Sequence, residues 1–181
     1  MTPVAWFVSA LAVLLLLSLL VMYNRFVRQR TLVEESWGGI DVELTRRHDL
    51  IPLVVETVKG YAAHEQALLT RLVEAREAAG AHHDDSPAHR QGFEQSVGGA
   101  LQQLLARVEA YPDLKANQGF LALQEELTNT EDRIAASRRF YNGNVRAYNT
   151  RVRTFPSNLV AALFRFRPRE FFGLSQGAVG G

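Results

Sequence analysis

The sequence predicts an all-α membrane protein: an N-terminal transmembrane helix, then an antiparallel, four-helix-like bundle of long helices with a short C-terminal helix. Residues 4–23 form an uncharged apolar run. From Thr31 onward, apolar residues recur at spacings of three and four, which is the pattern of amphipathic helices, and no segment alternates as a strand does. The 181 residues fit one domain with appendages. We therefore divide the chain into an anchor (1–24), a bundle (25–158), and an amphipathic segment with a mobile tail (159–181).

The apolar run, VAWFVSALAVLLLLSLLVMY, is long enough to cross a bilayer. At about 1.5 Å per residue, a helix of this length spans the ~30 Å hydrocarbon core. A cleaved signal peptide fits less well, because residues 1–3 carry no Lys or Arg and the run exceeds the usual ~7–15 apolar residues. Trp6 and Tyr23 are placed as aromatic anchors near the two interfaces.

The charges beside this run predict its orientation. Arg25, Arg28 and Arg30 follow it, whereas only the terminal amine precedes it. The positive-inside rule then gives a single-pass protein of the inner (cytoplasmic) membrane, N-out and C-in, with its soluble domain in the cytoplasm.

The first part of the bundle has two apolar stripes, over residues 37–44 and 50–72. Between them, Asp49 is a residue favoured at the N-cap of a helix. Pro52 suits the first helical turn, where a missing backbone N–H costs little. We therefore expect the helix to kink or restart here, and a second helix to continue to Gly80.

Breaker residues divide the rest of the bundle. A polar loop near 80–88 separates the second helix from a third, which Ser86-Pro87 begins and Tyr111-Pro112 ends. After a turn near 111–118, the longest stripe runs from Phe120 to Phe155. Its ~35 residues would form a helix ~50 Å long, which we expect to pair with the second helix along its whole length.

Three stretches of the chain resemble the LemA family: EESWGGIDVELTRRHDLIPLVVETVKGYAAHE, EAYPDLKANQGFLALQEELTNTEDRIAASRRFYN and YNTRVRTFPSNLVAALF. The resemblance covers Tyr23 to about Phe172. It implies an N-terminally anchored, all-helical bacterial membrane protein without agreed catalytic residues or cofactor. The chain departs from the family pattern at Leu53, where Asn is frequent, and at Gly38-Gly39. This glycine pair costs about 1 kcal/mol per residue relative to Ala, which suggests a soft point between anchor and bundle.

Catalytic and metal templates are incomplete. His64-Glu65 begins a zincin motif, but position 68 is Leu, so the second histidine is missing. The cluster HHDDSPAH, residues 82–89, has ligand-type side chains in a loop that we interpret as solvated. Phosphate-loop and nucleophile-elbow motifs are lacking. We therefore predict no enzyme activity, no cofactor and no metal.

The final third of the chain is strongly polarised in charge. Residues 138–169 carry eight Arg and no acid, whereas residues 125–132 carry four acids and no base. The Arg residues either pair with acids elsewhere in the bundle, meet anionic lipid headgroups or bind nucleic acid; the last is least favoured, because the interleaved aromatics recur at heptad spacing. The candidate lipid- or partner-facing residues are Arg139, Arg146, Arg153, Arg165, Arg167 and Arg169.

A seven-residue repeat underlies the same region. Tyr141, Tyr148 and Phe155 are seven apart, which predicts a core-facing row on one helix. Asn142 and Asn149 lie on its flank, where we expect them to form interhelical hydrogen bonds that determine register. Tyr141, Asn142, Tyr148 and Asn149 are the candidate register or contact residues.

The segment FPSNLVAALFRFRPREFF mixes large apolar residues with Arg. It is either an interfacial segment at the membrane surface or a short helix that folds back to cap the bundle. We expect a non-enzymatic scaffold or adaptor that binds other membrane or envelope proteins at the cytoplasmic face and that can also form a homo-oligomer. Among partners, the family resemblance suggests membrane proteases or envelope-stress components. The alternative is a lipid-binding or membrane-shaping protein that acts through this basic, aromatic third.

Overall fold

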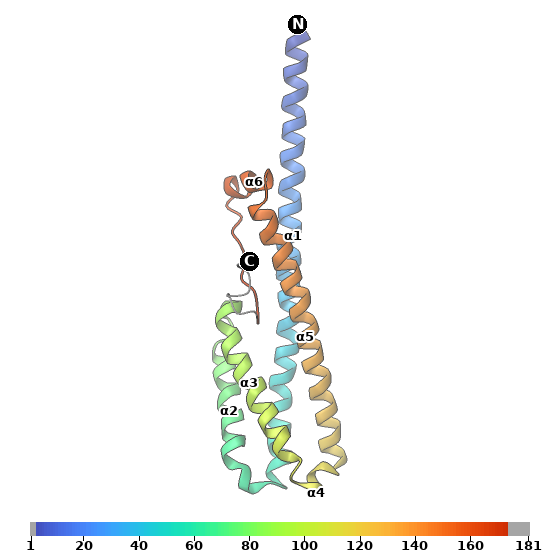
Figure 1. Cartoon of the computed structure of the whole chain (residues 1–181), viewed down its shortest axis with the longest axis vertical. Helices are drawn as coiled ribbons and strands as arrows, with labels where there is room; N and C mark the ends of the chain where they lie inside the picture. The colour runs from blue at the N-terminus through green and yellow to red at the C-terminus, as the bar shows by residue number, and fades with distance from the viewer. Residues whose placement is uncertain (1–2, 174–181) are drawn as a thin grey trace.

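The fold is all-α, as predicted, in a computed structural model that describes residues 3–173 (Figure 1). Those residues contain no strand. The predicted tail, residues 174–181, lies outside them. The elements are α1 (Pro3–Lys59), the short 3₁₀ helix η1 (Ala63–Glu65), α2 (Gln66–Ala81), α3 (Pro87–Val108), α4 (Pro112–Lys115), α5 (Gln118–Arg153) and α6 (Ser157–Leu163).

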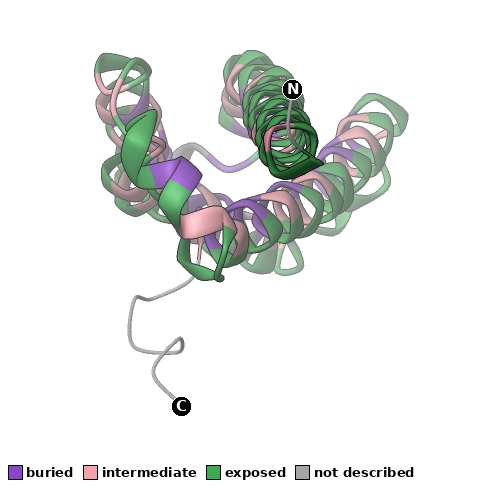
Figure 2. Ribbon diagram, turned by 90° about the horizontal axis from the view of Figure 1, so that it is seen from above, coloured by how far each residue is buried: buried purple, intermediate pink, exposed green. Residues whose placement is uncertain are grey.

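The anchor and the first bundle helix are one helix, α1, of 57 residues. Its apolar first part is the one helical segment of residues 3–173 that is long and apolar enough to cross a membrane, with a mean hydropathy of 2.7 in its most apolar window, none of which is buried. Figure 2 shows this part almost entirely exposed, whereas the helices below it carry buried residues. At about 1.5 Å per residue, α1 is ~85 Å long.

The predicted restart of the helix near His48 is wrong, because α1 continues through Pro52. Proline lacks the N–H that would bond the carbonyl four residues earlier, here that of His48. The Arg76 side chain from α2 donates to this carbonyl instead, with an Nε–O distance of 2.8 Å. A contact between helices thus satisfies the group that proline leaves free.

The predicted second helix is broken at Gly60, where α1 ends, although its last part, α2, ends at Ala81, close to the expected Gly80. The N–H groups of Tyr61 and Ala62 both donate to the Val58 carbonyl, at 3.1 and 2.8 Å, and close the end of α1. Gly38-Gly39 lies inside α1, where the helix is uninterrupted.

The later boundaries agree with the breaker residues. α3 begins at Pro87 after Ser86, and the Asn117 side chain caps α5 by accepting the Phe120 N–H at 2.9 Å. α5 has 36 residues and pairs with α1, not with a separate second helix. Because α5 ends at Arg153, the predicted core row stops before Phe155, which is exposed.

The bundle has two halves along its length. In the half far from the N-terminus, the α1–α5 pair packs on the α2–α3 hairpin (Figure 1). The apolar core there includes Ile51, Val54, Leu72, Leu104 and Phe120. This half is the expected four-helix bundle.

In the half near the anchor, a C-terminal segment takes the place of the hairpin. After α6, residues 164–173, which we name the strap, descend beside α1 and α5 toward the ends of α2 and α3 (Figure 1). A second core joins these parts and includes Phe26, Ile40, Tyr141, Val145 and Phe172. The predicted C-terminal segment therefore folds back onto the bundle, although Leu159 and Leu163 of α6 are exposed.

Candidate functional site: the strap groove and a buried ion network

The α1–α5 pair forms a groove that holds the strap. The seven-residue repeat positions Tyr141 and Tyr148 two turns apart on the inner face of α5, and both are buried. The Asn residue after each Tyr is also buried and faces the strap rather than another helix.

Asn142 and Asn149 hold the strap by its backbone. The Asn142 amide donates to the Phe172 carbonyl at 2.8 Å and accepts the Phe172 N–H at 3.0 Å. Asn149 makes the same pair of bonds with Arg169, both at 2.8 Å. The expectation that these amides bond between helices is therefore wrong, because an extended segment lies where a neighbouring helix was expected.

The two pairs match in spacing. Seven residues of helix rise ~10 Å, and three residues of extended chain, from Arg169 to Phe172, also cover ~10 Å. Since the earlier Asn binds the later strap residue, the strap runs antiparallel to α5. A heptad on the helix thus corresponds to a three-residue repeat on the strap.

Aromatic side chains complete the groove. Phe172 packs edge-on against Trp37, with ring centroids 5.3 Å apart, and Phe166 stacks on Phe26 at 4.8 Å. The Tyr141 hydroxyl donates to the Glu170 carbonyl at 2.8 Å. Burial raises the pKa of Tyr141 to about 12, so this hydroxyl remains a donor at physiological pH. Burial also raises the pKa of Tyr148.

The candidate Arg residues divide into two groups. Arg169 is half-buried and forms an ion pair with Glu34 at 2.8 Å. This agrees with the interpretation that the Arg residues pair with acids elsewhere in the bundle. The others are exposed and have no ion-pair partner within residues 3–173: Arg139, Arg146, Arg153, Arg165 and Arg167. Within the described residues, these five therefore do not pair with acids of the bundle.

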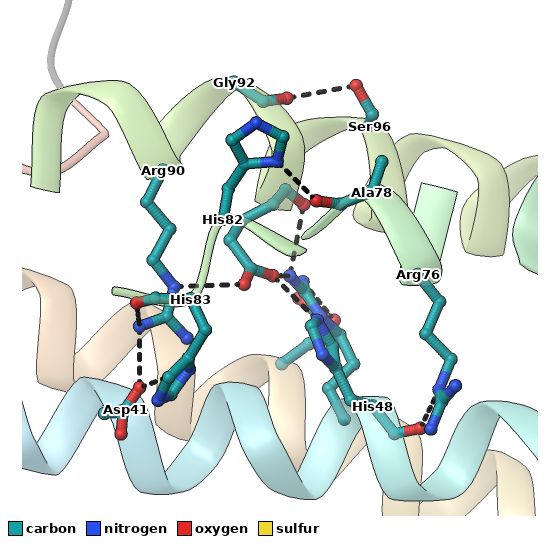
Figure 3. A network of polar contacts seen from close by, with 12 residues as sticks. Asp41, His48, Arg76, Ala78, His82, His83, Arg90, Gly92 and Ser96 are labelled. Atoms are coloured by element: carbon teal, nitrogen blue, oxygen red, sulfur yellow. Dashed lines mark hydrogen bonds and ion pairs between the residues drawn. The ribbon is translucent and has the colours of Figure 1, made fainter. Parts of the chain in front are cut away.

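A buried ion network lies beside the far end of the strap (Figure 3). Arg90 on α3 points toward α1, where its guanidinium donates to Asp41 at 2.7 Å and to the His83 carbonyl at 3.1 Å. Its Nε also lies 3.4 Å from Glu94. Arg90 is almost fully buried, so these acceptors replace its hydration.

Glu94 connects this group to a second arginine. Arg47 on α1 donates to the Glu94 carboxylate at 2.5 Å and to Glu131 on α5 at 3.0 Å, and His48 Nε2 lies 3.2 Å from Glu94. Burial by itself raises the pKa of the Glu94 carboxyl. The hydrogen bond with His48 and the charge of Arg47 outweigh burial and hold this pKa below its ordinary value.

Sequence reasoning missed this network. Two features of the sequence could have indicated it. Arg47 is a charged residue at a core-facing position of α1, and Arg90 and Glu94 lie four residues apart on α3. Sequence spacing cannot show which charged residues of different helices face one another.

The histidine loop is largely exposed, as a solvated loop would be, but some of its side chains contact one another or α3. His82 stacks on Phe93 with centroids 3.8 Å apart, and His89 Nδ1 lies 2.6 Å from an Asp85 oxygen.

Glu65, which follows His64 in the incomplete zincin motif, is engaged in other contacts. Its carboxylate accepts hydrogen bonds from Arg107 and Tyr111, both at 2.7 Å. Within residues 3–173, no three His, Asp or Glu side chains are arranged to hold a metal ion.

The strap and the ion network meet. The Gly173 N–H donates to the Gln91 side chain at 3.1 Å, and the Arg90 guanidinium lies 5.7 Å from the centre of the Trp37 ring. Between them is a cavity of about 190 Å³, lined in part by Arg47, Glu94 and Phe172. Chemically, the arrangement binds an extended chain; within the described residues it presents paired charges rather than an activated nucleophile.

Comparison with known proteins identifies relatives along most of the chain. A model of the LemA family matches residues 36–179. The chain is 26% identical over 190 residues to magnetosome protein MamQ 2 of Paramagnetospirillum magneticum, covering 91% of this chain and 70% of the relative. It is 24% identical to magnetosome protein MamQ of Magnetospirillum gryphiswaldense (86% and 66% covered) and 28% identical to protein LemA of Metamycoplasma hominis (76% and 63% covered).

Proposed function

This protein belongs to the LemA family, and from that premise we propose that it is a non-enzymatic scaffold of the inner membrane that binds other membrane or envelope proteins at its cytoplasmic face. The observation that carries this proposal is the continuity of α1 from Pro3 to Lys59. Since anchor and bundle share one helix, the bundle is an extension of the membrane span.

The exposed faces of the bundle support a binding role. Beyond the anchor, Val42 on α1 and Phe140 on α5 are large apolar side chains that face solvent. Exposed apolar groups on long helices are suited to helix-in-groove or bundle-type contacts. A membrane anchor also confines the search for partners to the membrane plane. Membrane proteases and envelope-stress components are the partners that the family resemblance suggests.

Site-specific photo-crosslinking in the native membrane tests this function. A photoreactive residue at Phe140 or Val42 should capture the same membrane or envelope proteins repeatedly, whereas one at the anchor residue Leu15 should capture lipid. If Phe140 and Val42 yield only lipid adducts and contacts with the same chain, the scaffold proposal fails.

The orientation is tested separately. A reporter that matures only in the cytosol, fused after Gly181, should be active, and an enzyme that folds only in the periplasm should be inactive at the same position. Reversing Arg25 and Arg28 to Glu should shift part of the population to the opposite orientation, because these charges favour the cytoplasm. A dark cytosolic reporter with an active periplasmic one would reverse the proposed topology.

A second candidate function, contact with anionic lipid, is favoured by the position of α6. The Phe164 ring, just after α6, lies 4.8 Å from that of Tyr23, the last residue of the apolar run. Near this level the exposed fractions of Phe155, Leu159 and Leu163 are 75, 61 and 66%. A helix beside the membrane exit of α1 with its apolar residues uncovered suits insertion at the bilayer interface.

The charges at the same end agree with this second function. Arg153, Arg165 and Arg167 are exposed near α6, and Arg25 and Arg28 are exposed on α1. Basic residues beside apolar ones bind anionic headgroups, with about 1 kcal/mol for each Lys or Arg near the surface.

An environment-sensitive dye tests lipid contact. Because the chain has no cysteine, Leu159→Cys in the full chain allows the dye to be attached at one site, with Gln102→Cys on distal α3 as the control. In nanodiscs, the dye at residue 159 should shift to the blue and be quenched by nitroxide lipids, more strongly when anionic lipid is present. Equal signals at residues 159 and 102 would contradict lipid contact.

A further inference from the structure

The strap is bound in the groove much as a peptide ligand would be. From residue 166 to residue 173 it has no helix or strand. Within the described chain, no backbone–backbone hydrogen bond joins residues 167–173 to the helices. Its main-chain bonds are instead made with side chains, those of Asn142, Asn149 and Tyr141 on α5 and of Gln91 on α3. An amide that both donates to and accepts from one residue recognises extended backbone whatever its side chain.

Side-chain contacts add a sequence preference to this backbone recognition. Phe166 stacks on Phe26, Arg169 pairs with Glu34, and Phe172 packs against Trp37. The positions 166, 169 and 172 are evenly spaced, and the last two are those held by the Asn amides. The groove is therefore complementary to an aromatic, a basic and an aromatic residue at every third position of an extended chain.

The strap does not fill the groove. Arg167, Pro168 and Glu170 are exposed. A cavity of about 500 Å³ lies between the strap and the helices, bordered in part by Trp37 and Glu34. At its upper end, just after α6, the strap residue Arg165 has a φ of 57°, a conformation that non-glycine residues rarely adopt. If the strap left the groove, Arg165 could return to a more common backbone conformation.

The bundle does not depend on the strap for its framework. The core of the distal half contains no strap residue. In the other half, α1 and α5 still meet through Ile40, Leu44 and Val145, which are fully buried. We therefore expect an empty groove to leave the long helix pair intact.

We propose that the α1–α5 groove is a binding site for an extended basic-aromatic segment of a partner protein, and that the strap occupies this site as an internal competitor. This inference rests on the proposed scaffold function and deepens it by stating the chemistry of the partner segment. The match between Glu34 and a basic residue, and the aromatic contacts on both sides of it, determine which segments displace the strap.

The test uses the full chain in nanodiscs and a fluorescent peptide of residues 164–173, FRFRPREFFG. In one variant, residues 166–172 are replaced by Gly and Ser, which empties the groove but keeps Glu34 and both Asn residues. The peptide should bind this variant at least tenfold more tightly than the natural chain, where the strap competes. A scrambled peptide measures non-specific binding to lipid.

Matched variants identify the binding groups. In the strap-replaced chain, Asn142→Leu with Asn149→Leu should weaken peptide binding at least tenfold, because four hydrogen bonds to the peptide backbone are lost. Asn144→Leu, on the same helix, should leave binding unchanged, since the Asn144 amide contacts the Leu32 carbonyl rather than the strap.

Three results would overturn the proposal. The first is a strap-replaced chain that stays helical by circular dichroism but does not bind the peptide. The second is loss of helicity in this variant, since the strap would then be part of the fold. The third is a disulfide-linked heterodimer between co-expressed Glu34→Cys and Arg169→Cys chains, above that of an Arg139→Cys and Arg169→Cys control, because the occupant would then be a second copy.

The groove and the scaffold function can fail separately. Specific peptide binding with no protein captured by photo-crosslinking would reject the scaffold function. Captured proteins without peptide binding would reject only the groove, and the partners would then bind elsewhere on the bundle.

Discussion

Asn149 and Arg169 lie twenty residues apart in sequence and are joined by two hydrogen bonds of 2.8 Å, one in each direction between the Asn amide and the Arg backbone. Asn142 and Phe172 repeat this relationship two helical turns away. Together these pairs hold an irregular segment against α5 at two points.

Replacing either amide should loosen the strap without reducing helicity. Asn142→Leu or Asn149→Leu leaves a backbone donor and acceptor of the strap unpaired, and the expected loss is about 1–3 kcal/mol of unfolding free energy for each variant. Hydrogen exchange measured by mass spectrometry should accelerate at Arg169 and Phe172. Asn144→Leu is the matched control, and equal exchange in all three variants would contradict the role of the amides.

Pro52 and Arg76 should be energetically coupled. Arg76→Ala leaves the His48 carbonyl without a partner, which should cost about 1–3 kcal/mol. In a Pro52→Ala background, the new N–H of residue 52 can bond this carbonyl, so Arg76→Ala should cost at least ~1 kcal/mol less. A double-mutant cycle by denaturant unfolding measures this difference, and additive effects would show that the two groups do not share the carbonyl.

Glu94 should make stability depend on acid pH. Its pKa in the folded protein lies below the ordinary value of 4.5, so its contribution is present at neutral pH and is lost as the pH falls below about 4.5 through the folded-state pKa. Glu94→Gln should lower stability at pH 7 by roughly 3 kcal/mol, because Arg47 and Arg90 lose a buried partner. Compared with the natural chain, its melting temperature should vary less between pH 3 and 5.

Exposed Glu77→Gln on α2 provides the control for that comparison, since it should leave the pH dependence unchanged. If the Glu94 and Glu77 variants show the same pH dependence, His48 and Arg47 do not lower the pKa of the Glu94 carboxyl.

Gly38 and Gly39 should be replaceable by alanine with a gain in stability. Both lie inside α1, and a Cβ at either position would have no atom within 4 Å. Each change to Ala should add about 0.5–1 kcal/mol, since Gly loses more backbone freedom on helix formation. Thermal unfolding in detergent measures this gain. A loss of stability would indicate that α1 bends here in the membrane.

Gly173→Ala provides the opposite control. Its φ is 76°, and a Cβ there would meet the Arg138 side chain at 2.6 Å. This variant should lose stability, and a gain would contradict the position of the strap end.

The sequence was sufficient where structure depends on neighbours within a few turns. The apolar run, the helical spacing from Thr31 onward, the start of α3 at Ser86-Pro87 and the extent of α5 are all local properties, and the structure contains each of them. The family could also be identified from the sequence, because its motifs are contiguous.

Only the tertiary structure decided the partners of the polar groups. Whether Pro52 ends a helix depends on an Arg76 side chain from another helix, and what Asn149 binds depends on how the chain turns after α6. Arg47 and Glu94 are 47 residues apart, so no local pattern relates them. A buried polar group is stable only with its partner present, and that partner is chosen by the packing of the whole chain.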